Sequence, residues 1–318
     1  MQSLPSLTQP LSFVPLYMER VWGGRQLADQ LGRDLPGSSP IGESWELVDR
    51  EGEQSVVGDG PLKGTTLHEL WTEHRKAIFG ETASDSPRFP LLGKILDARD
   101  TLSVQVHPPA DIAPTLKGEP KTEMWYLLDA TPDASLYAGF RTGTTRQSFE
   151  KAISDGQVQS TLHMIPVKAG DTMFIPSGRC HAIGAGCLII EIQQNSDTTY
   201  RLYDWDRMGL DGKPRELHVK ESLISTDFAD HEPALAAEID ESLVSCEHFE
   251  VSRWQLTQPR AEQDGIGTVF VVVSGTIQIG GKQFTTGDWF LLPACVQDRT
   301  LSPVNGEACM LRCVLPAR

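Results

Sequence analysis

The sequence Gly170-Asp-Thr-Met-Phe-Ile-Pro176-Ser-Gly178-Arg-Cys-His181 decides the fold. It begins with a glycine, continues with an apolar run of strand length, and reaches a histidine shortly after a Pro-x-Gly turn. Proline fixes φ and glycine reaches positive φ, so Pro176 and Gly178 predict a tight turn between two strands. We therefore expect one strand that starts after Gly170 and a second strand that carries His181 inward.

Two other fragments bring polar side chains to strands. Gln105 and His107 stand two residues apart in LSVQVHP (102–108), so a strand directs both side chains to the same face. Glu123 begins another apolar run of strand length. The inward faces of strands meet inside a small barrel, where Gln105, His107, Glu123 and His181 can hold one divalent cation. These nitrogen and oxygen donors suit Zn²⁺, with Mn, Fe or Co as alternatives.

The rest of the chain has the texture of a β protein. From Pro90 onward, apolar runs of strand length alternate with Gly and Pro turns, as they do in sandwiches and barrels. Helical spacing occurs in four short stretches, which are 24–31, 66–79, 147–162 and 220–224.

Residues 170–181 match the second sequence motif of the cupin family. A polar, acidic stretch later leads into a second β-rich segment, 246–318. We predict a mainly β protein with two cupin-like β-barrels of the jelly-roll type and a small helical insertion in the N-terminal part. The expected domains are residues 1–240, with the metal and the helical insertions, and residues 241–318. The second barrel is expected to lack a metal because no histidine follows Pro293.

Composition limits the classes of function. The 318 residues are 39% hydrophobic and 22% charged, which is typical of a globular protein with a sizeable core. The net charge of -15 argues against partners such as nucleic acid or an anionic membrane. No signal peptide or membrane-spanning run is recognisable, and the six cysteines lack CxxC spacing. We expect a soluble cytoplasmic protein with reduced thiols, either a monomer or a small homo-oligomer.

Over nearly its whole length the chain resembles the type I phosphomannose isomerases, or mannose-6-phosphate isomerases, of the short bacterial kind. The similarity is strongest in GESWEL (42–47), FPLLGKILDARDTLSVQVHP (89–108), EPKTEMWYLL (119–128), GDTMFIPSGRCHAIG (170–184) and EIQQNSDTTYRLYDWDR (191–207). The chain departs from the general cupin pattern by having QxH in place of HxH and a long interval between His107 and Glu123. The resembled family shares both features. Ala185 stands where a general cupin has asparagine.

This resemblance implies a zinc enzyme that interconverts mannose 6-phosphate and fructose 6-phosphate by proton transfer through a cis-enediolate. Carried over residue by residue, the zinc ligands fall on the same four residues named above, and the catalytic arginine falls on Arg201. Lys121 and Asp197 match further catalytic positions. Lys94 matches a lysine near the substrate pocket, where Arg201 also binds substrate. The implied partner is a small sugar phosphate.

Several roles stay open at this stage. Lys121 is either a proton shuttle whose pKa the metal lowers, or a charge that balances an acidic neighbour or the substrate. Arg201 either stabilises the enediolate or forms an exposed ion pair, and Asp197 either orients a group or caps a turn. The general base is unassigned. The candidates for binding the phosphate are Lys94, Arg20, Arg141 and Arg201.

Two other classes of function remain as alternatives. One is a cupin oxidoreductase such as an iron dioxygenase, which favours more histidine ligands and an apolar O₂ pocket. The other is a sugar-binding cupin without catalytic activity, because a fold does not by itself imply a function.

Overall fold

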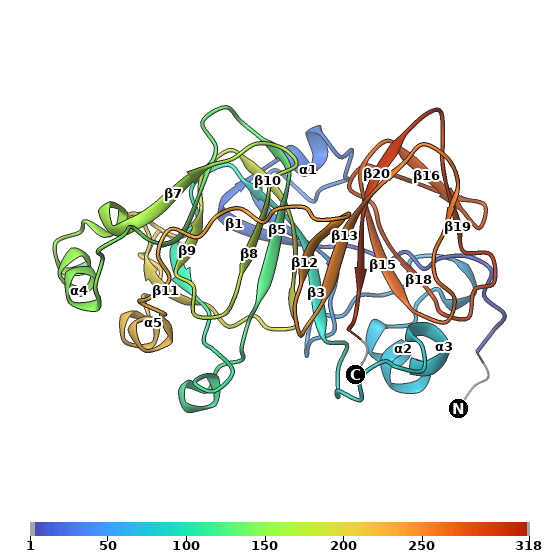
Figure 1. Ribbon diagram of the computed structural model, residues 1–318, viewed down its shortest axis with the longest axis horizontal. Coiled ribbons are helices and arrows are strands. Elements are labelled where there is room, and N and C mark those ends of the chain that lie inside the picture. Colours follow the sequence, from blue (N-terminus) through green and yellow to red (C-terminus); the bar gives the residue numbers. More distant parts are fainter. Residues whose placement is uncertain (1–3, 317–318) are drawn as a thin grey trace. The chain divides into compact units, whose positions relative to one another are not determined.

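The structure is a computed structural model that describes residues 4–316, and β-strands dominate it (Figure 1). The strands are β1 (Leu16–Gly24), β2 (Ile41–Leu47), β3 (Leu91–Ala98), β4 (Val104–Val106), β5 (Glu123–Ala130), β6 (Ser135–Phe140), β7 (Leu162–Pro166), β8 (Thr172–Ile175), β9 (His181–Ile183), β10 (Cys187–Gln194), β11 (Tyr200–Tyr203), β12 (Ser242–Ser245), β13 (Glu250–Leu256), β14 (Arg260–Ala261), β15 (Thr268–Ser274), β16 (Thr276–Ile279), β17 (Lys282–Thr285), β18 (Trp289–Leu292), β19 (Thr300–Pro303) and β20 (Ala308–Val314). The predicted mainly β fold class is confirmed.

Helices are few and short. They are α1 (Gln26–Asp29), α2 (Leu67–Glu73), α3 (Arg75–Phe79), α4 (Arg146–Ser154) and α5 (Val219–Ser225), with single 3₁₀ turns η1 (Gly60–Leu62), η2 (Ala113–Leu116) and η3 (Val158–Thr161). Within residues 4–316, none of them has the length and apolar character that crossing a bilayer requires.

The strands form four sheets. The first has six strands in the order β1-β2-β3-β10-β5-β8, and the second has five in the order β11-β4-β9-β6-β7. The third has five strands, β12-β13-β20-β15-β18, and the fourth has four, β14-β19-β16-β17. Strands that are neighbours in a sheet are often distant in sequence, as when β10 pairs with β5 from Gln193↔Glu123 to Cys187↔Ala130. Such long-range antiparallel pairing is characteristic of jelly-roll proteins.

Contacts divide the chain into two compact units, each made of separate segments. One unit contains residues 17–44 and 94–236, and the other contains residues 1–16, 45–93 and 237–318. The contacts group the segment 45–93 with the C-terminal strands. The division into domains 1–240 and 241–318 stays a prediction.

In the unit that contains residues 94–236, the inner faces of two sheets share one apolar core. Trp125 and Ile189 come from the six-stranded sheet, and Leu136 and Ile183 come from the five-stranded sheet. Burying aromatic and branched side chains from both faces is what stabilises a pair of packed sheets.

The outer face of the five-stranded sheet packs against the helical insertion. Val104 and Phe140 of the sheet share a cluster with Phe149 of α4 and Val158 of η3. The rings of Phe140 and Phe149 meet edge to face, with their centroids 4.8 Å apart. Figure 1 shows α5 beside β11. The predicted helical stretch 147–162 is therefore α4 followed by a separate 3₁₀ turn.

The other unit contains the predicted helix over 66–79, which is two helices broken at His74. Thr66 begins α2 with a capping box, in which its hydroxyl accepts from the Glu69 amide while the Glu69 carboxylate accepts from the Thr66 amide. His74 has φ of −127° and interrupts the helical backbone. Gly80, with φ of 100°, ends α3 where glycine was expected to stop the helix.

Candidate metal centre and cavity

Strand pairing sets three polar side chains in one row. In the five-stranded sheet Arg201 of β11 lies opposite Gln105 of β4, and Gln105 lies opposite His181 of β9. Residues directly opposite each other in antiparallel strands project from the same face. Val104 and Val106, on either side of Gln105, are buried. The i and i+2 alternation predicted for this strand therefore positions the row.

The Pro-x-Gly turn brings His107 and His181 together. Gly178 has φ of 92°, as the turn prediction required, and its amide donates to the carbonyl of His107 at 2.8 Å. This bond holds the end of β4 against the turn that precedes β9. The two imidazole centroids are 4.8 Å apart.

Both imidazoles direct the same nitrogen toward the same point. Nδ1 of His107 lies 2.9 Å from the carbonyl of Thr198, and Nδ1 of His181 lies 2.8 Å from the carbonyl of Arg179. A carbonyl only accepts, so Nδ1 carries the proton in each ring. Each Nε2 is buried and has no hydrogen-bond partner. Two buried lone pairs without partners are costly unless a ligand occupies the space between them.

Electrostatics keeps both rings neutral. Burial, followed by the nearby charge of Lys121, holds the pKa of His107 well below its ordinary value. Burial lowers the pKa of His181 to about 4, although the hydrogen bond to Arg179 opposes this change. Near neutral pH each Nε2 therefore presents a lone pair, which is the form that binds a metal.

A carboxylate completes the cluster. Glu123, the first residue of β5, places one oxygen 3.5 Å from Nε2 of His107 and the other 3.6 Å from Nε2 of His181. The donor atoms of the three residues lie within 4.8 Å of one another, and all three side chains are buried. This donor set fits a divalent cation. Gln105 stands next to His181 in the cross-strand row.

A series of ion pairs of alternating sign leads away from the cluster. Lys121 lies 2.9 Å from Glu123 and 3.8 Å from Glu191, and Lys94 lies 3.5 Å from both Glu191 and Glu43. Arg20 then pairs with Glu43 at 2.9 Å. Neighbouring strands of the six-stranded sheet carry most of these side chains, so the sheet sets their spacing.

The protonation states follow from this pairing. Burial disfavours the ammonium of Lys121, but the attraction of Glu123 and Glu191 outweighs it and raises the pKa. Burial raises the pKa of Glu191, while Lys121 opposes that change. Glu191 also accepts a hydrogen bond of 3.1 Å from the indole of Trp125. The side chain of Lys121 is therefore a protonated ammonium group that can donate a proton.

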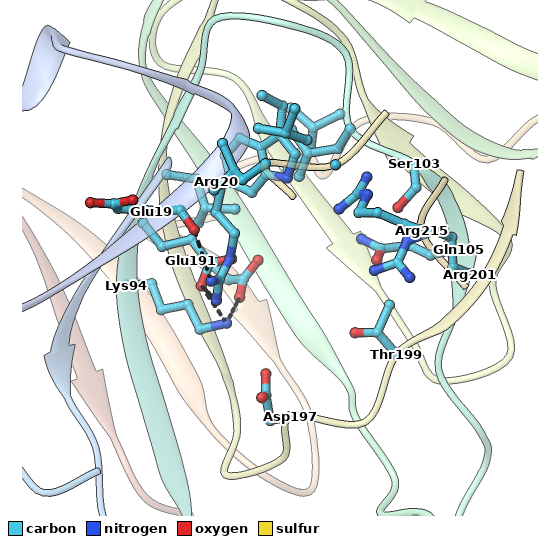
Figure 2. A pocket seen from close by; sticks show the side chains of 18 of the residues that line it. Glu19, Arg20, Lys94, Ser103, Gln105, Glu191, Asp197, Thr199, Arg201 and Arg215 are labelled. Atoms are coloured by element: carbon cyan, nitrogen blue, oxygen red, sulfur yellow. Dashed lines mark hydrogen bonds and ion pairs between the residues drawn. The ribbon is translucent and has the colours of Figure 1, made fainter. Parts of the chain in front are cut away.

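A cavity of about 600 Å³ opens beside the cluster. Figure 2 shows two walls, with Arg20, Lys94 and Glu191 on one side and Arg201 and Arg215 on the other. The second wall also carries the polar side chains Ser103, Gln105 and Thr199. A volume of this size with convergent polar groups suits a small, highly polar ligand.

Arg201 is held by a backbone carbonyl and a side chain of the loop that follows it. Its Nη1 donates to the carbonyl of Glu216 at 2.8 Å, and its amide donates to Nδ1 of His218 at 3.3 Å. Its Nε is buried and has no hydrogen-bond partner. Burial and the nearby Arg215 lower the pKa of Arg201. An arginine keeps its charge despite such a shift, so this guanidinium is a cation with an unused donor.

Comparison with known proteins identifies the family. Residues 11–132 match the model of the phosphomannose isomerase type I catalytic domain. A curated relative, mannose-6-phosphate isomerase ManA of Bacillus subtilis, is 41% identical over 300 residues, covering 90% of this chain and 93% of the relative. The chain belongs to the mannose-6-phosphate isomerase family. A Streptococcus mutans mannose-6-phosphate isomerase is 38% identical over 303 residues, covering 92% and 94% of the two chains.

A solved structure of this family has the same fold. The crystal structure of the mannose 6-phosphate isomerase from Bacillus subtilis has a TM-score of 0.86 and 32% identity, covering 96% of this chain and 99% of that one. The family resemblance inferred from the sequence is thus confirmed, and so is the fold class.

Most of the site residues predicted from the sequence lie close together in the structure. Gln105, Lys94, Lys121, Asp197 and Arg201 all line the cavity, and the metal cluster lies beside it. Their chemical roles remain predictions, because geometry gives their location only.

Of the four candidates for binding phosphate, Arg141 is the exception. It is exposed, its Nε donates to the carbonyl of Leu162, and it is not among the residues lining the cavity.

Sequence reasoning missed five charged residues of the cavity, which are Glu19, Glu43, Glu191, Asp211 and Arg215. Glu43 and Glu191 are buried carboxylates that pair with Lys94, and Arg215 reaches the wall from a long loop. A single acidic residue inside the apolar run CLIIEIQQ (187–194) was the available signal for Glu191, because an ionised side chain is rarely buried without a partner.

Proposed function

We propose that this protein interconverts mannose 6-phosphate and fructose 6-phosphate with one bound divalent cation. The observation that carries the proposal is the convergence of His107, Glu123 and His181, with two neutral Nε2 atoms directed at one point beside a highly polar cavity. Membership of the family supports it, since two curated relatives bear the name of this activity.

The cation would be held by His107, His181 and Glu123, and we propose Gln105 as the fourth ligand. The mixed nitrogen and oxygen donors favour Zn²⁺, with Mn, Fe or Co as alternatives. When bound there, the cation would supply a Lewis acid that polarises the sugar carbonyl and lowers the cost of removing the adjacent proton. The two backbone carbonyls on the Nδ1 atoms fix the tautomers that this binding requires.

The chain's own groups then handle protons and charge. Aldose–ketose isomerisation moves one proton between C1 and C2 and another between O1 and O2, and we propose that it passes through a cis-enediolate. Lys121 is buried, protonated and at the cavity wall, so it can donate a proton to a sugar oxygen. The unused Nε of Arg201 can donate to an oxygen that gains negative charge. Asp197 is exposed at the cavity and can accept a hydrogen bond from a sugar hydroxyl.

Charge pairing favours the Arg201 wall for the phosphate. On the opposite wall, Arg20 and Lys94 each have a carboxylate within 3.5 Å, which already compensates their charge. The guanidinium of Arg201 instead donates to the carbonyl of Glu216 and has no carboxylate of the described chain bonded to it, and Arg215, which pairs with Asp204, stands beside it. Two guanidiniums with neighbouring hydroxyls of Ser103 and Thr199 match a dianionic phosphate. Lys94 would then contact the sugar rather than the phosphate.

The test is an assay of the purified protein with mannose 6-phosphate in D₂O, together with metal analysis. We expect one divalent cation per chain, formation of fructose 6-phosphate, and exchange of the C2 proton. Binding of the sugar phosphate without proton exchange would favour the non-catalytic sugar-binding alternative. Turnover that requires O₂ would favour the dioxygenase alternative, whereas an isomerase works without it.

We also propose a reducing, cytoplasmic location, as predicted from the sequence. All six cysteines are free thiols in the structure, and this suits a compartment in which disulfides do not form.

A further inference from the structure

We propose that Asp204 is a positioning residue that holds Arg215 at the cavity wall in the orientation that binds the phosphate of the substrate. The inference rests on the proposed function. It concerns the loop after β11, residues 204–218, which leaves the sheet at Asp204 and returns beside Arg201.

Asp204 forms a fork with two arginines of this loop. Its Oδ2 accepts from Nε of Arg215 at 2.6 Å, and its Oδ1 accepts from Nη2 of Arg215 at 2.5 Å. The same Oδ1 also accepts from Nε and Nη2 of Arg207 at 3.1 and 2.8 Å. Asp204 is buried, and a bidentate pair of this kind fixes the plane as well as the position of a guanidinium.

The rest of the loop offers Arg215 little other support. Its outer part is a hairpin closed by the amide of Gly209 donating to the carbonyl of Lys213. Met208 and Leu210 in that hairpin are 54% and 58% exposed, so little apolar packing orders it. Arg215 is on the returning limb and lines the cavity. An arginine on such a loop would sample many rotamers without its carboxylate partner.

Asp204 sits at the neck of the loop, where both limbs meet. Trp205 directly after it has φ of 56° and donates its indole proton to the carbonyl of Leu102 at 2.7 Å. On the returning limb, the amide of His218 donates to the carbonyl of Arg201 at 2.6 Å. The carboxylate therefore ties Arg215 to the anchored end of the loop and beside Arg201, rather than to its exposed tip.

Removing the negative charge of Asp204 distinguishes two roles by the direction in which the affinity for phosphate changes. Asp204 is a carboxylate next to the wall where the phosphate binds, so removing its charge makes the wall more positive. A purely electrostatic role predicts tighter binding of phosphate when Asp204 is neutralised. A positioning role predicts weaker binding, because the phosphate must then order the Arg215 side chain itself.

The main experiment measures binding of inorganic phosphate by calorimetry, and its inhibition constant against isomerisation, for wild type and Asp204→Asn. We expect Kd for phosphate to rise about five- to tenfold, the loss expected when a ligand must order a long side chain. KM for mannose 6-phosphate should rise in parallel, while kcat and metal content change little. Unchanged or tighter phosphate binding would overturn the proposal.

A double-mutant cycle tests whether Asp204 acts through Arg215. In an Arg215→Met background, Asp204→Asn should cost little further affinity for phosphate, because the residue it positions is already absent. A full additional loss in that background would overturn the proposal. Arg215→Lys keeps the charge but loses the fork, so it should weaken phosphate binding even if Asp204→Asn proves unstable, and wild-type affinity in Arg215→Lys would count against the inference.

The matched control is Arg207→Gln. Arg207 contacts the same carboxylate but is not among the cavity-lining residues of the described chain, so its phosphate Kd should stay within about threefold of wild type. A loss as large as that of Asp204→Asn would assign the effect to the neck of the loop in general and overturn the specific role. Because calorimetry needs no turnover, a wild-type protein that binds phosphate but does not isomerise would refute the proposed function alone.

Discussion

Removing the His181 imidazole should abolish the stabilisation that a bound metal gives to the fold. His181 is fully buried and its Nε2 faces Glu123, so His181→Ala deletes one of the converging donors. At a metal concentration one hundred times Kd, binding stabilises a folded protein by about 2.7 kcal/mol. If losing one ligand weakens affinity about 100-fold, the same concentration contributes only about 0.4 kcal/mol. The difference, about 2.3 kcal/mol, corresponds to about 3 °C in Tm for a chain of this size.

The assay must separate this loss from the damage done by the substitution itself. His181→Ala also leaves the Arg179 carbonyl without its donor, which costs about 1–3 kcal/mol with or without metal. We would therefore compare Tm with metal and with EDTA for each protein and use only the difference between the two conditions. Wild type should show a shift of several degrees, and His181→Ala should show almost none.

The control is His163→Ala, which removes a half-buried imidazole of β7 that is not part of the metal cluster. It should keep the wild-type EDTA shift and the wild-type metal content. A His181→Ala protein that retains both the full shift and one metal per chain would refute the assignment of His181 as a ligand.

Three further predictions address Arg201, a helix cap and one thiol. Arg201→Ala should keep its metal while kcat falls at least about 100-fold, the cost of losing one donor to a developing oxyanion, and an unchanged rate in a coupled assay would exclude the role. Thr66→Ala should lower the free energy of unfolding by about 1 kcal/mol without affecting turnover, as measured by urea denaturation. Hydrogen bonds from Thr66 lower the pKa of the Glu69 carboxyl. The cap therefore contributes its full stability above the ordinary pKa of a glutamate, and this contribution is lost as the pH falls through the lowered pKa. The loss of stability caused by Thr66→Ala should accordingly be smaller in acid. Burial raises the pKa of the Cys295 thiol, so at pH 8 iodoacetamide should alkylate it more slowly than a free cysteine, and Cys295→Ser should change stability by less than about 0.5 kcal/mol.

The sequence was most informative where local rules determine direction. The alternation around Gln105 and the turn at Gly178 each follow from two or three neighbouring residues, and the structure bears out both. The meeting of His107, Glu123 and His181 followed from strand logic together with the family resemblance.

Local sequence rules could not predict which residues pair when they are far apart in the sequence. Lys94 could be nominated as a cavity residue, but its carboxylate partners Glu43 and Glu191 come from strands far away in sequence. Arg215 was missed because nothing in a polar loop indicates which limb returns to the sheet. Arg141 was nominated for its charge alone, and charge does not determine location. The break at His74 was missed for a similar reason, since helical spacing continues on both sides of it.

The pairing register of the short strand β4 determines both which side chains it buries and which side chain it presents to the cavity. Val104 and Val106 are buried on one face, and Gln105 emerges on the other toward the cavity. A slip of one residue in the pairing of β4 would turn the valines to the cavity and bury the amide in hydrocarbon. The same valines that close the core therefore disfavour any slip by an odd number of residues, so burying the valines and presenting the amide to the cavity depend on the same pairing.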